Sequence, residues 1–253
     1  MTADALPRLP PGYRLVRHAV IGSTNEEARR LARAGAANRT VVWALQQTAG
    51  RGRRGRPWYS PPGNLYMSLI LRPCAAPERA AQLGFVVALA VGGALDRLCP
   101  GLAGLSYKWP NDVLLDGRKI CGILLEAESG EGAERFFLVA GVGVNLVAAP
   151  PAVEFPATSL AEQGLPEIAP QTALAALLVE FERWMERWET AGFAPIREAW
   201  RERAVLGVSI RVRLDRLTLY GRFRDIDDEG ALLLEEAGRC RRIAAGDVFP
   251  VQG

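Results

Sequence analysis

The N-terminal half of the chain alternates short runs of strand periodicity with longer runs of helix periodicity. Residues 13–20 alternate between apolar and polar side chains, and residues 40–46 and 65–71 are rich in β-branched and aromatic residues, so each run predicts a strand. Ser23 and Glu26 have the spacing of a capping box, and the apolar positions that follow predict a helix ending at Gly35. Residues 77–99, with Pro77 at the start, are apolar on most sides and predict a buried packing helix.

The second half begins with strands, continues with two helices and ends with strands. Asp116-Gly117 between alternating apolar residues predicts a hairpin, and residues 135–146 predict a buried strand that contains Gly141 and Gly143. Residues 171–190 and 195–203 predict amphipathic helices, and residues 208–214, 217–226, 232–235 and 241–244 predict short strands. The pattern favours an α+β fold with a mixed sheet and packing helices in residues 1–204, followed by a small β-barrel in residues 205–253.

Composition narrows the class of protein. The chain has 253 residues, a net charge of +3 and 49% hydrophobic residues, which is ordinary for a globular protein and too weakly basic to indicate nucleic-acid binding by itself. Four scattered cysteines and a single histidine, His18, offer no zinc site and suggest free thiols in a reducing cytosol. We find no signal peptide and no apolar run long enough to span a membrane, so we expect a cytoplasmic protein.

Residues 47–58, here called the basic loop, carry the most unusual composition in the chain. Four arginines alternate with three glycines before the first large apolar residue, Trp58; they are Arg51, Arg53, Arg54 and Arg56, with Gly50, Gly52 and Gly55. Arginine presents a fixed fork of donors that suits carboxylate and phosphate, and glycine allows close backbone approach. The loop therefore predicts an anion site, and the alternatives are a solvated turn or an unspecific nucleic-acid patch.

A second candidate site surrounds Lys108. Only two of the 31 basic residues are lysine, Lys108 and Lys119, which hints that these positions require an ammonium group. Pro110 interrupts the strand after Lys108, so Asn111 and Asp112 should lie at a bend beside the lysine. The alternative is a surface lysine paired with Asp112. Glycines within the strand 135–146 indicate close approach by a ligand or another backbone segment, and Asn145 ends that strand.

Four motifs in this order resemble the catalytic domain of bacterial biotin–protein ligases. They are Ser23-Thr-Asn25, Gly50-Arg-Gly-Arg-Arg-Gly55, Lys108-Trp-Pro-Asn-Asp112 and Gly141-Val-Gly-Val-Asn145. The resemblance covers residues 13–200, and residues 205–253 resemble the C-terminal domain of the same ligases. It implies adenylation of biotin by ATP with Mg²⁺, followed by transfer of biotin to a lysine of a biotin carboxyl carrier protein. About a dozen residues precede the first strand, so the chain resembles the monofunctional ligases, which lack a DNA-binding domain, and we expect no binding to DNA.

The resemblance also assigns expected roles to individual residues. The residues expected to bind biotin are Ser23, Thr24, Asn25, Gln47, Arg51, Gly52, Arg53, Lys108 and Val142. Those expected to bind the nucleotide are Arg53, Trp58, Asn111 and Asn145, and the expected catalytic cations are Lys108, Arg53 and Arg51. Asp112 is a candidate either to help bind Mg²⁺ or to receive the attacking lysine of the acceptor protein. The family often forms homodimers, so the resemblance implies a homodimer for this chain as well.

Two rival functions deserve a test. A lipoate or octanoate ligase of the same superfamily would lack the Gly-Arg-Gly-Arg-Arg-Gly motif of the basic loop. A nucleic-acid-binding module would use the basic loop and the C-terminal barrel, but it leaves the Lys108-Trp-Pro-Asn-Asp112 motif unexplained. A P-loop kinase does not fit, because the sequence has no G-x-x-x-x-G-K-[ST] motif.

Overall fold

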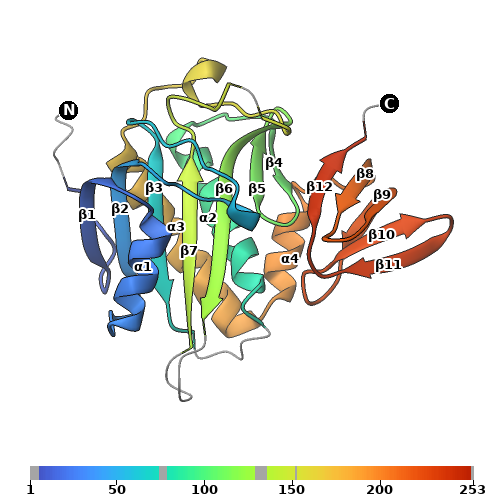
Figure 1. The fold of residues 1–253 in the computed structure, drawn as a ribbon, viewed down its shortest axis with the longest axis horizontal. Coiled ribbons are helices and arrows are strands. Elements are labelled where there is room, and N and C mark those ends of the chain that lie inside the picture. Colours follow the sequence, from blue (N-terminus) through green and yellow to red (C-terminus); the bar gives the residue numbers. More distant parts are fainter. Residues whose placement is uncertain (1–5, 74–78, 129–135, 152, 252–253) are drawn as a thin grey trace.

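A mixed sheet forms the larger part of the molecule (Figure 1). The computed structural model describes residues 6–73, 79–128, 136–151 and 153–251. The sheet has seven strands in the order β1-β2-β3-β7-β6-β5-β4. Their bounds are β1 Arg14–Ile21, β2 Thr40–Gln47, β3 Leu65–Leu71, β4 Leu105–Lys108, β5 Asp112–Leu115, β6 Arg118–Glu128 and β7 Phe137–Val144.

Chain connectivity explains the mixed pairing. Helix α1 (Thr24–Arg33) crosses from β1 to β2, so these two strands run parallel. All other neighbours in this sheet are antiparallel. The β5–β6 hairpin turns at Asp116 and Gly117, whose φ angles of 48° and 71° match the two-residue turn that Asp-Gly predicts.

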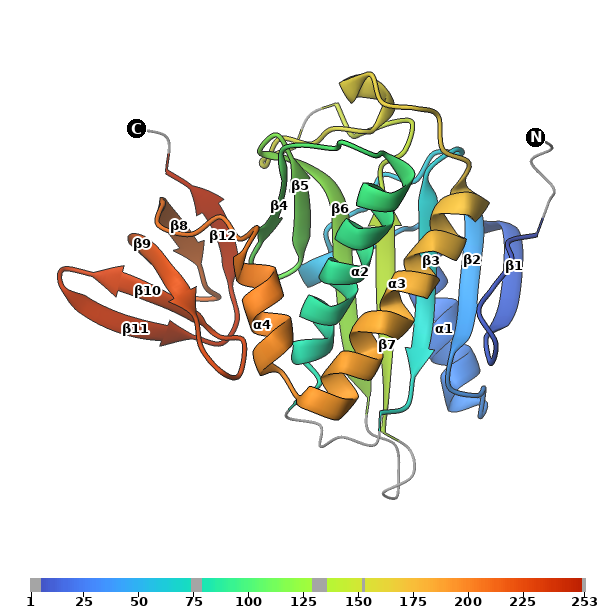
Figure 2. The same ribbon diagram turned by 180° about the vertical axis from the view of Figure 1, so that it is seen from behind.

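Helices cover the two faces of the sheet differently. Helices α2 (Gln82–Leu98) and α3 (Pro170–Ala191) pack together on the face seen in Figure 2, where they bury the main hydrophobic core. Helix α1 covers β2, β3 and β7 on the opposite face, above a small core that contains Ala28, Val42 and Phe137. The remainder of that face beside α1 is left for the cavity described below.

The C-terminal strands form a second, small antiparallel sheet. Its order is β11-β10-β9-β8-β12, with bounds β8 Ser209–Arg213, β9 Thr218–Ile226, β10 Leu232–Glu236, β11 Arg239–Ile243 and β12 Asp247–Pro250. The end strands β11 and β12 share no ladder among the described residues, so the expected barrel is open on that side. Helix α4 (Ala194–Arg201) lies between the two sheets, and Trp109 donates a hydrogen bond of 2.9 Å to the carbonyl of Gly230.

The α+β class and the order of the predicted elements agree with the sequence analysis, which left out one strand. Strand β12 was not predicted, because only Val248 and Phe249 give it strand character. The predicted helix start at Pro77 and the predicted strand start at Arg135 lie outside the described residues. The boundary between residues 204 and 205 stays a prediction, and around it Arg203 and Val205 hydrogen-bond to Tyr107 of β4.

No helix in the described ranges combines the length and apolarity that crossing a bilayer requires.

Candidate active site

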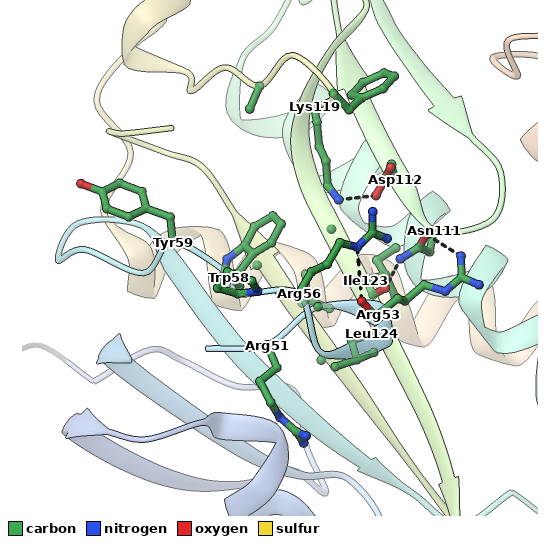
Figure 3. A pocket seen from close by; sticks show the side chains of 18 of the residues that line it. Arg51, Arg53, Arg56, Trp58, Tyr59, Asn111, Asp112, Lys119, Ile123 and Leu124 are labelled. Atoms are coloured by element: carbon green, nitrogen blue, oxygen red, sulfur yellow. Dashed lines mark hydrogen bonds and ion pairs between the residues drawn. The ribbon is translucent and has the colours of Figure 1, made fainter. Parts of the chain in front are cut away.

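A cavity of about 530 Å³ lies on the face of the large sheet that α1 only partly covers. Its walls come from the start of α1, the end of β2, the basic loop, strands β4 to β7, residues 150, 153–155 and 157, and the β12 residues 247–249. From β2 to β5 there are four strand spacings of about 4.8 Å, or about 19 Å. The cavity is therefore long enough to bring groups from distant parts of the sequence to one elongated ligand (Figure 3).

One end of the cavity carries uncharged polar groups. The side-chain oxygen of Gln47 accepts hydrogen bonds from the backbone N–H and the hydroxyl of Thr24, at 2.8 and 3.1 Å. The amide nitrogen of Gln47 donates to Ser60 at 3.0 Å. Ser23 is the N-cap of α1, yet its side chain makes no capping hydrogen bond. The predicted capping box is thus not formed, and Ser23 is one of the residues that line the cavity.

Asn25 connects the start of α1 to the large sheet. Its side chain donates to Glu126 at 2.9 Å and accepts from the Ser68 hydroxyl at 2.5 Å. A Cβ atom at Gly141 would lie 2.0 Å from the Asn25 oxygen, so glycine at this strand position is what lets α1 approach the sheet. Asn25 lines the cavity and also fixes the start of α1, which carries Ser23 and Thr24.

Trp58 lies in a cradle made by two glycines. A Cβ atom at Gly143 would lie 2.4 Å from the indole nitrogen, and one at Gly122 would lie 2.8 Å from the ring. Gly143 and Gly122 are paired across β6 and β7. The strand glycines were expected to admit a ligand or backbone; the structure shows that they admit the side chains of Trp58 and Asn25. The buried indole nitrogen has no hydrogen-bond partner.

Both lysines of the chain meet at Asp112. Lys108 Nζ lies 2.6 Å from one carboxylate oxygen, and Lys119 Nζ lies 2.5 Å from the other. Burial lowers the pKa of Lys108, and Asp112 opposes this shift. Burial alone would raise the pKa of Asp112, but the two ammonium groups outweigh it and hold that pKa well below its usual range. With both lysines protonated and Asp112 ionised, the cluster has a formal charge of +1.

The arginines of the basic loop are paired with carboxylates on two sides of the cavity. Arg51 pairs with Glu26 of α1 and points away from Lys119 and Asp112 (Figure 3). Arg53 and Arg56 lie 3.5 and 3.1 Å from Asp247 of β12. The predicted cations therefore line one cavity, but the structure divides them between two ends. Gly52 also lines the cavity, and its N–H donates to the Arg56 carbonyl at 2.7 Å.

The two predicted asparagines line the cavity in different ways. Asn111 donates to the carbonyl of Ile123 at 2.6 Å and so fastens the β4–β5 turn to β6. Asn145 is only 1% exposed; its amide nitrogen donates to Thr158 at 3.0 Å, while its amide oxygen has no partner. A buried oxygen without a partner is costly to the fold.

Val142 also lines the cavity, through its backbone. Gly141 and Gly143 face Asn25 and Trp58, so the intervening Val142 side chain points to the helix-covered face and belongs to the main core. Any contact of Val142 with a ligand ring would use its main-chain atoms.

Three further cavity residues were missed by the sequence analysis: Lys119, Phe155 and Asp247. Phe155 places its ring 4.6 Å from Lys108 Nζ, from a proline-rich segment that carried no motif. The rarity of lysine gave a signal for Lys119, but only the β5–β6 pairing shows that it meets Asp112. Asp247 reaches the site through docking of the small sheet, which the local sequence pattern does not encode.

The described residues do not fit a magnesium ion held by protein ligands alone. Among them, no group of three or more His, Cys, Asp or Glu side chains converges to hold a metal. Asp112 has ammonium groups at both oxygens, and the other cavity carboxylates, Glu154 and Asp247, are paired with arginines. A Mg²⁺ ion that arrives with ATP would have to be held mainly by the phosphates.

Comparisons with known proteins agree with this geometry. Residues 18–145 match the model of the biotin/lipoate A/B protein ligase family, and residues 205–249 match the biotin protein ligase C-terminal domain. The biotin–[acetyl-CoA-carboxylase] ligase of Paracoccus denitrificans is 44% identical over 234 residues, which cover 90% of this chain and 96% of that protein. The bifunctional ligase/repressor BirA of Bacillus subtilis is 37% identical, over 94% of this chain and 74% of its own length.

A solved structure shares the architecture. The biotin protein ligase from Aquifex aeolicus in complex with biotin and ATP superposes with a TM-score of 0.80 at 26% identity, covering 95% of this chain and 99% of that one. Its likeness extends over both sheets, and the sequence matches cover the cavity motifs as well as the C-terminal strands. This chain therefore belongs to the biotin/lipoate A/B protein ligase family.

Proposed function

We propose that this chain adenylates biotin with ATP and transfers the biotinyl group to a lysine of a biotin carboxyl carrier protein. The observation that supports this most is that one cavity joins an uncharged hydrogen-bonding end at Gln47 to a cationic end at Lys108. Biotin has the matching shape of a polar ureido ring, an apolar chain and a carboxylate. Relatives named as biotin ligases share this region of the sequence.

In the first step the carboxylate of biotin attacks the α-phosphate of ATP, giving biotinyl-AMP and pyrophosphate. Two anions must approach each other, so cations between them lower the barrier. Lys108, with Lys119 and Arg53 nearby in the same cavity, is placed to supply that charge. Asp112 fixes both ammonium groups and leaves one positive charge unbalanced. Loss of one such cation should cost about 3 kcal/mol of transition-state stabilisation.

At the other end, we assign the ureido ring to the polar groups around α1. The Ser23 hydroxyl makes no capping bond, and Thr24 and Gln47 are held by their mutual hydrogen bonds. Because these groups are already oriented, binding would require little rearrangement. Asn25, which also lines the cavity, holds α1 against Gly141.

We assign the nucleotide to the side of the cavity bounded by Trp58 and Asn145. Both residues line the cavity, where the indole ring offers a flat surface on which a base can stack. Mg²⁺ would then neutralise the phosphates. The acceptor amine of the second step attacks the acyl carbon and AMP leaves. Cytoplasmic location and a homodimer are further expectations for this chain.

The rival functions are less consistent with the cavity. A nucleic-acid-binding loop needs free cations, whereas Arg51, Arg53, Arg54 and Arg56 all pair with carboxylates of the chain. A lipoate or octanoate ligase would share the cationic end, but its substrate lacks the ureido groups that the Gln47 end would bind.

The test is exchange of labelled pyrophosphate into ATP with biotin, lipoate or octanoate as the added acid. Of the three acids, we expect only biotin to support exchange. When a purified carrier domain is added, we expect biotin to be transferred to that domain. Exchange that prefers lipoate or octanoate would show that the acid is misassigned. Exchange with none of the three would refute the adenylation step.

A further inference from the structure

Asp247, at the start of β12, is the point at which the small sheet enters the cavity. The residue is only 6% exposed, and three guanidinium groups of the basic loop surround its carboxylate. Arg56 donates a hydrogen bond of 3.1 Å to it, and Arg53 and Arg54 lie at 3.5 and 3.7 Å. Three arginines of one loop thus share a single buried carboxylate from the other sheet.

The backbone on either side of Asp247 also contacts cavity cations. The carbonyl of Gly246 accepts from Arg53 at 3.0 Å, and the carbonyl of Val248 accepts from Lys108 at 3.3 Å. Three consecutive residues of the small sheet therefore contact the cations assigned to the reaction. The positions of Arg53 and Lys108 in the cavity therefore depend on how the small sheet docks against the large one.

The charge balance explains what Asp247 achieves. Gathering three guanidinium groups in a half-buried loop is opposed by their mutual repulsion and by desolvation. Burial lowers the pKa of Arg53, and Asp247 opposes that shift while Arg54 and Arg56 add to it. One buried carboxylate among three guanidinium groups permits their assembly, and with Asp215 also paired to Arg54 the group keeps one net positive charge for an incoming polyanion.

We propose that Asp247 is a positioning residue for ATP: it holds Arg53 and Arg56 at the cavity so that they meet the triphosphate. This inference rests on the proposed adenylation reaction. It makes the small C-terminal sheet part of the active site, since the loop that binds phosphate is oriented by a residue of β12. Without Asp247 the basic loop would lose its common anchor, and the arginines would have to be ordered by ATP itself.

The test compares Asp247→Asn with Asp215→Asn. Asp215 also pairs with the loop, through Arg54 at 2.8 Å, but it is 88% exposed, so its loss removes a pair that solvent already screens. For Asp247→Asn we expect the KM for ATP to rise about 10-fold or more, as for the loss of one partner in a buried charge pair. The KM for ATP should change more than the KM for biotin, and Asp215→Asn should resemble wild type throughout.

A second readout needs no catalysis. Trypsin cleaves after arginine, so the rate of cleavage between residues 51 and 55, followed by mass spectrometry, reports how firmly the basic loop is held. Relative to wild type, we expect cleavage there to be about 10-fold faster in Asp247→Asn and unchanged in Asp215→Asn. Added ATP should slow the cleavage in both variants. If Asp247→Asn does not fold, Arg56→Gln removes the hydrogen-bonded partner from the loop side, and it should also speed cleavage at Arg53 and Arg54.

The outcomes separate this inference from the proposed function. A KM for ATP and a loop cleavage rate in Asp247→Asn that both match Asp215→Asn would overturn the positioning role. An equal loss in every kinetic constant together with a lower melting temperature would likewise overturn it, because that is the result of a structural role alone. Wild-type protein without biotin-dependent exchange would refute the adenylation reaction, while the cleavage rates would still report whether Asp247 holds the loop.

Discussion

At the scale of single residues, the lysine–aspartate–lysine cluster decides the chemistry of the cavity. Asp112 binds one ammonium group with each oxygen, and both lysines of an otherwise arginine-based chain are used there. An ammonium group is a compact point charge, whereas a guanidinium group is a larger planar fork. The sequence indicated Lys108 and Asp112 through their motif, and it hinted at Lys119 only through composition, because strand pairing brings that residue to the site.

Asp112→Asn should destabilise the protein strongly. The substitution leaves two buried ammonium groups without their counter-charge, and breaking such a pair typically costs about 3–5 kcal/mol. Chemical denaturation should show this loss in the free energy of unfolding. Asp116→Asn is the matched control: Asp116 lies exposed in the next turn with φ at 48°, which asparagine tolerates equally well. Equal stability of the two variants would contradict the account of the cluster.

The pH dependence of the reaction should follow Lys108. Its pKa in the folded protein is lowered by burial, so the ammonium loses its proton at a lower pH than a free lysine, whose pKa is about 10.4. Exchange activity should therefore fall on the alkaline side before pH reaches about 10.4. Lys108→Arg should be slower but keep its charge, so its alkaline limb should move upward. An alkaline limb identical in both proteins would assign the titration to another group.

Stability should respond to pH in two directions. The lowered pKa of Asp112 means that its contribution is complete above its ordinary value of about 3.9 and is lost as pH falls below it. The lowered pKa of Lys108 acts at the other extreme: between its folded and unfolded pKa values the unfolded chain binds more protons, so stability rises with pH there. Denaturation curves in Asp112→Asn should lack the acid-side dependence that this residue adds.

At the scale of elements, the site depends on glycines in strands β6 and β7 that let side chains lie flat on the sheet. The sequence predicted these strands and noted Gly141 and Gly143, because hydrophobic runs and glycines are local features. It did not predict what fills the space, since Trp58 and Asn25 come from a loop and a helix placed by tertiary packing. Short strands such as β12 were missed for a related reason: their pairing is set by a distant partner.

Gly143→Ala should displace Trp58 and damage the cavity. The added methyl group would lie 2.4 Å from a rigid indole ring, so the ring must move, and overpacking of this kind costs about 1–3 kcal/mol. The melting temperature should fall, and the KM for biotin should rise. Gly84→Ala in α2 is the control, because its new methyl group meets nothing within 4 Å and alanine favours a helix. The account is wrong if the two variants behave alike.

At the scale of the whole molecule, the two sheets share one continuous core. Buried residues of the small sheet, such as Val212 and Phe223, belong to the same hydrophobic cluster as those beneath α2 and α3. Phe85 contacts Phe193 and Trp200 edge-on, with ring centroids 5.3 and 5.2 Å apart. In the sequence, a change from helix to strand periodicity predicted a second part after residue 204. How the two parts dock could not be predicted, because docking depends on contacts between residues far apart in the chain.

We expect the chain to unfold as one unit in spite of its two sheets. Far-UV circular dichroism and tryptophan fluorescence should give coincident transitions. Trp109→Phe removes the hydrogen bond to Gly230, leaves that buried carbonyl unpaired, and should destabilise the protein by about 1–3 kcal/mol. Two separated transitions in the wild-type protein would show that the small sheet is an independent unit and would weaken its assignment to the active site.

The most direct measurement is pyrophosphate exchange into ATP, with and without biotin, in wild type, Lys108→Ala and Arg97→Ala. Arg97 pairs with Glu180 on the helix-covered face, far from the cavity lining, and serves as the control for loss of a positive charge. We predict biotin-dependent exchange in wild type and Arg97→Ala, and a rate about 10²-fold lower in Lys108→Ala, as expected for about 3 kcal/mol of lost transition-state stabilisation. Exchange in Lys108→Ala at the rate of Arg97→Ala would contradict the central claim that this cationic end performs the chemistry.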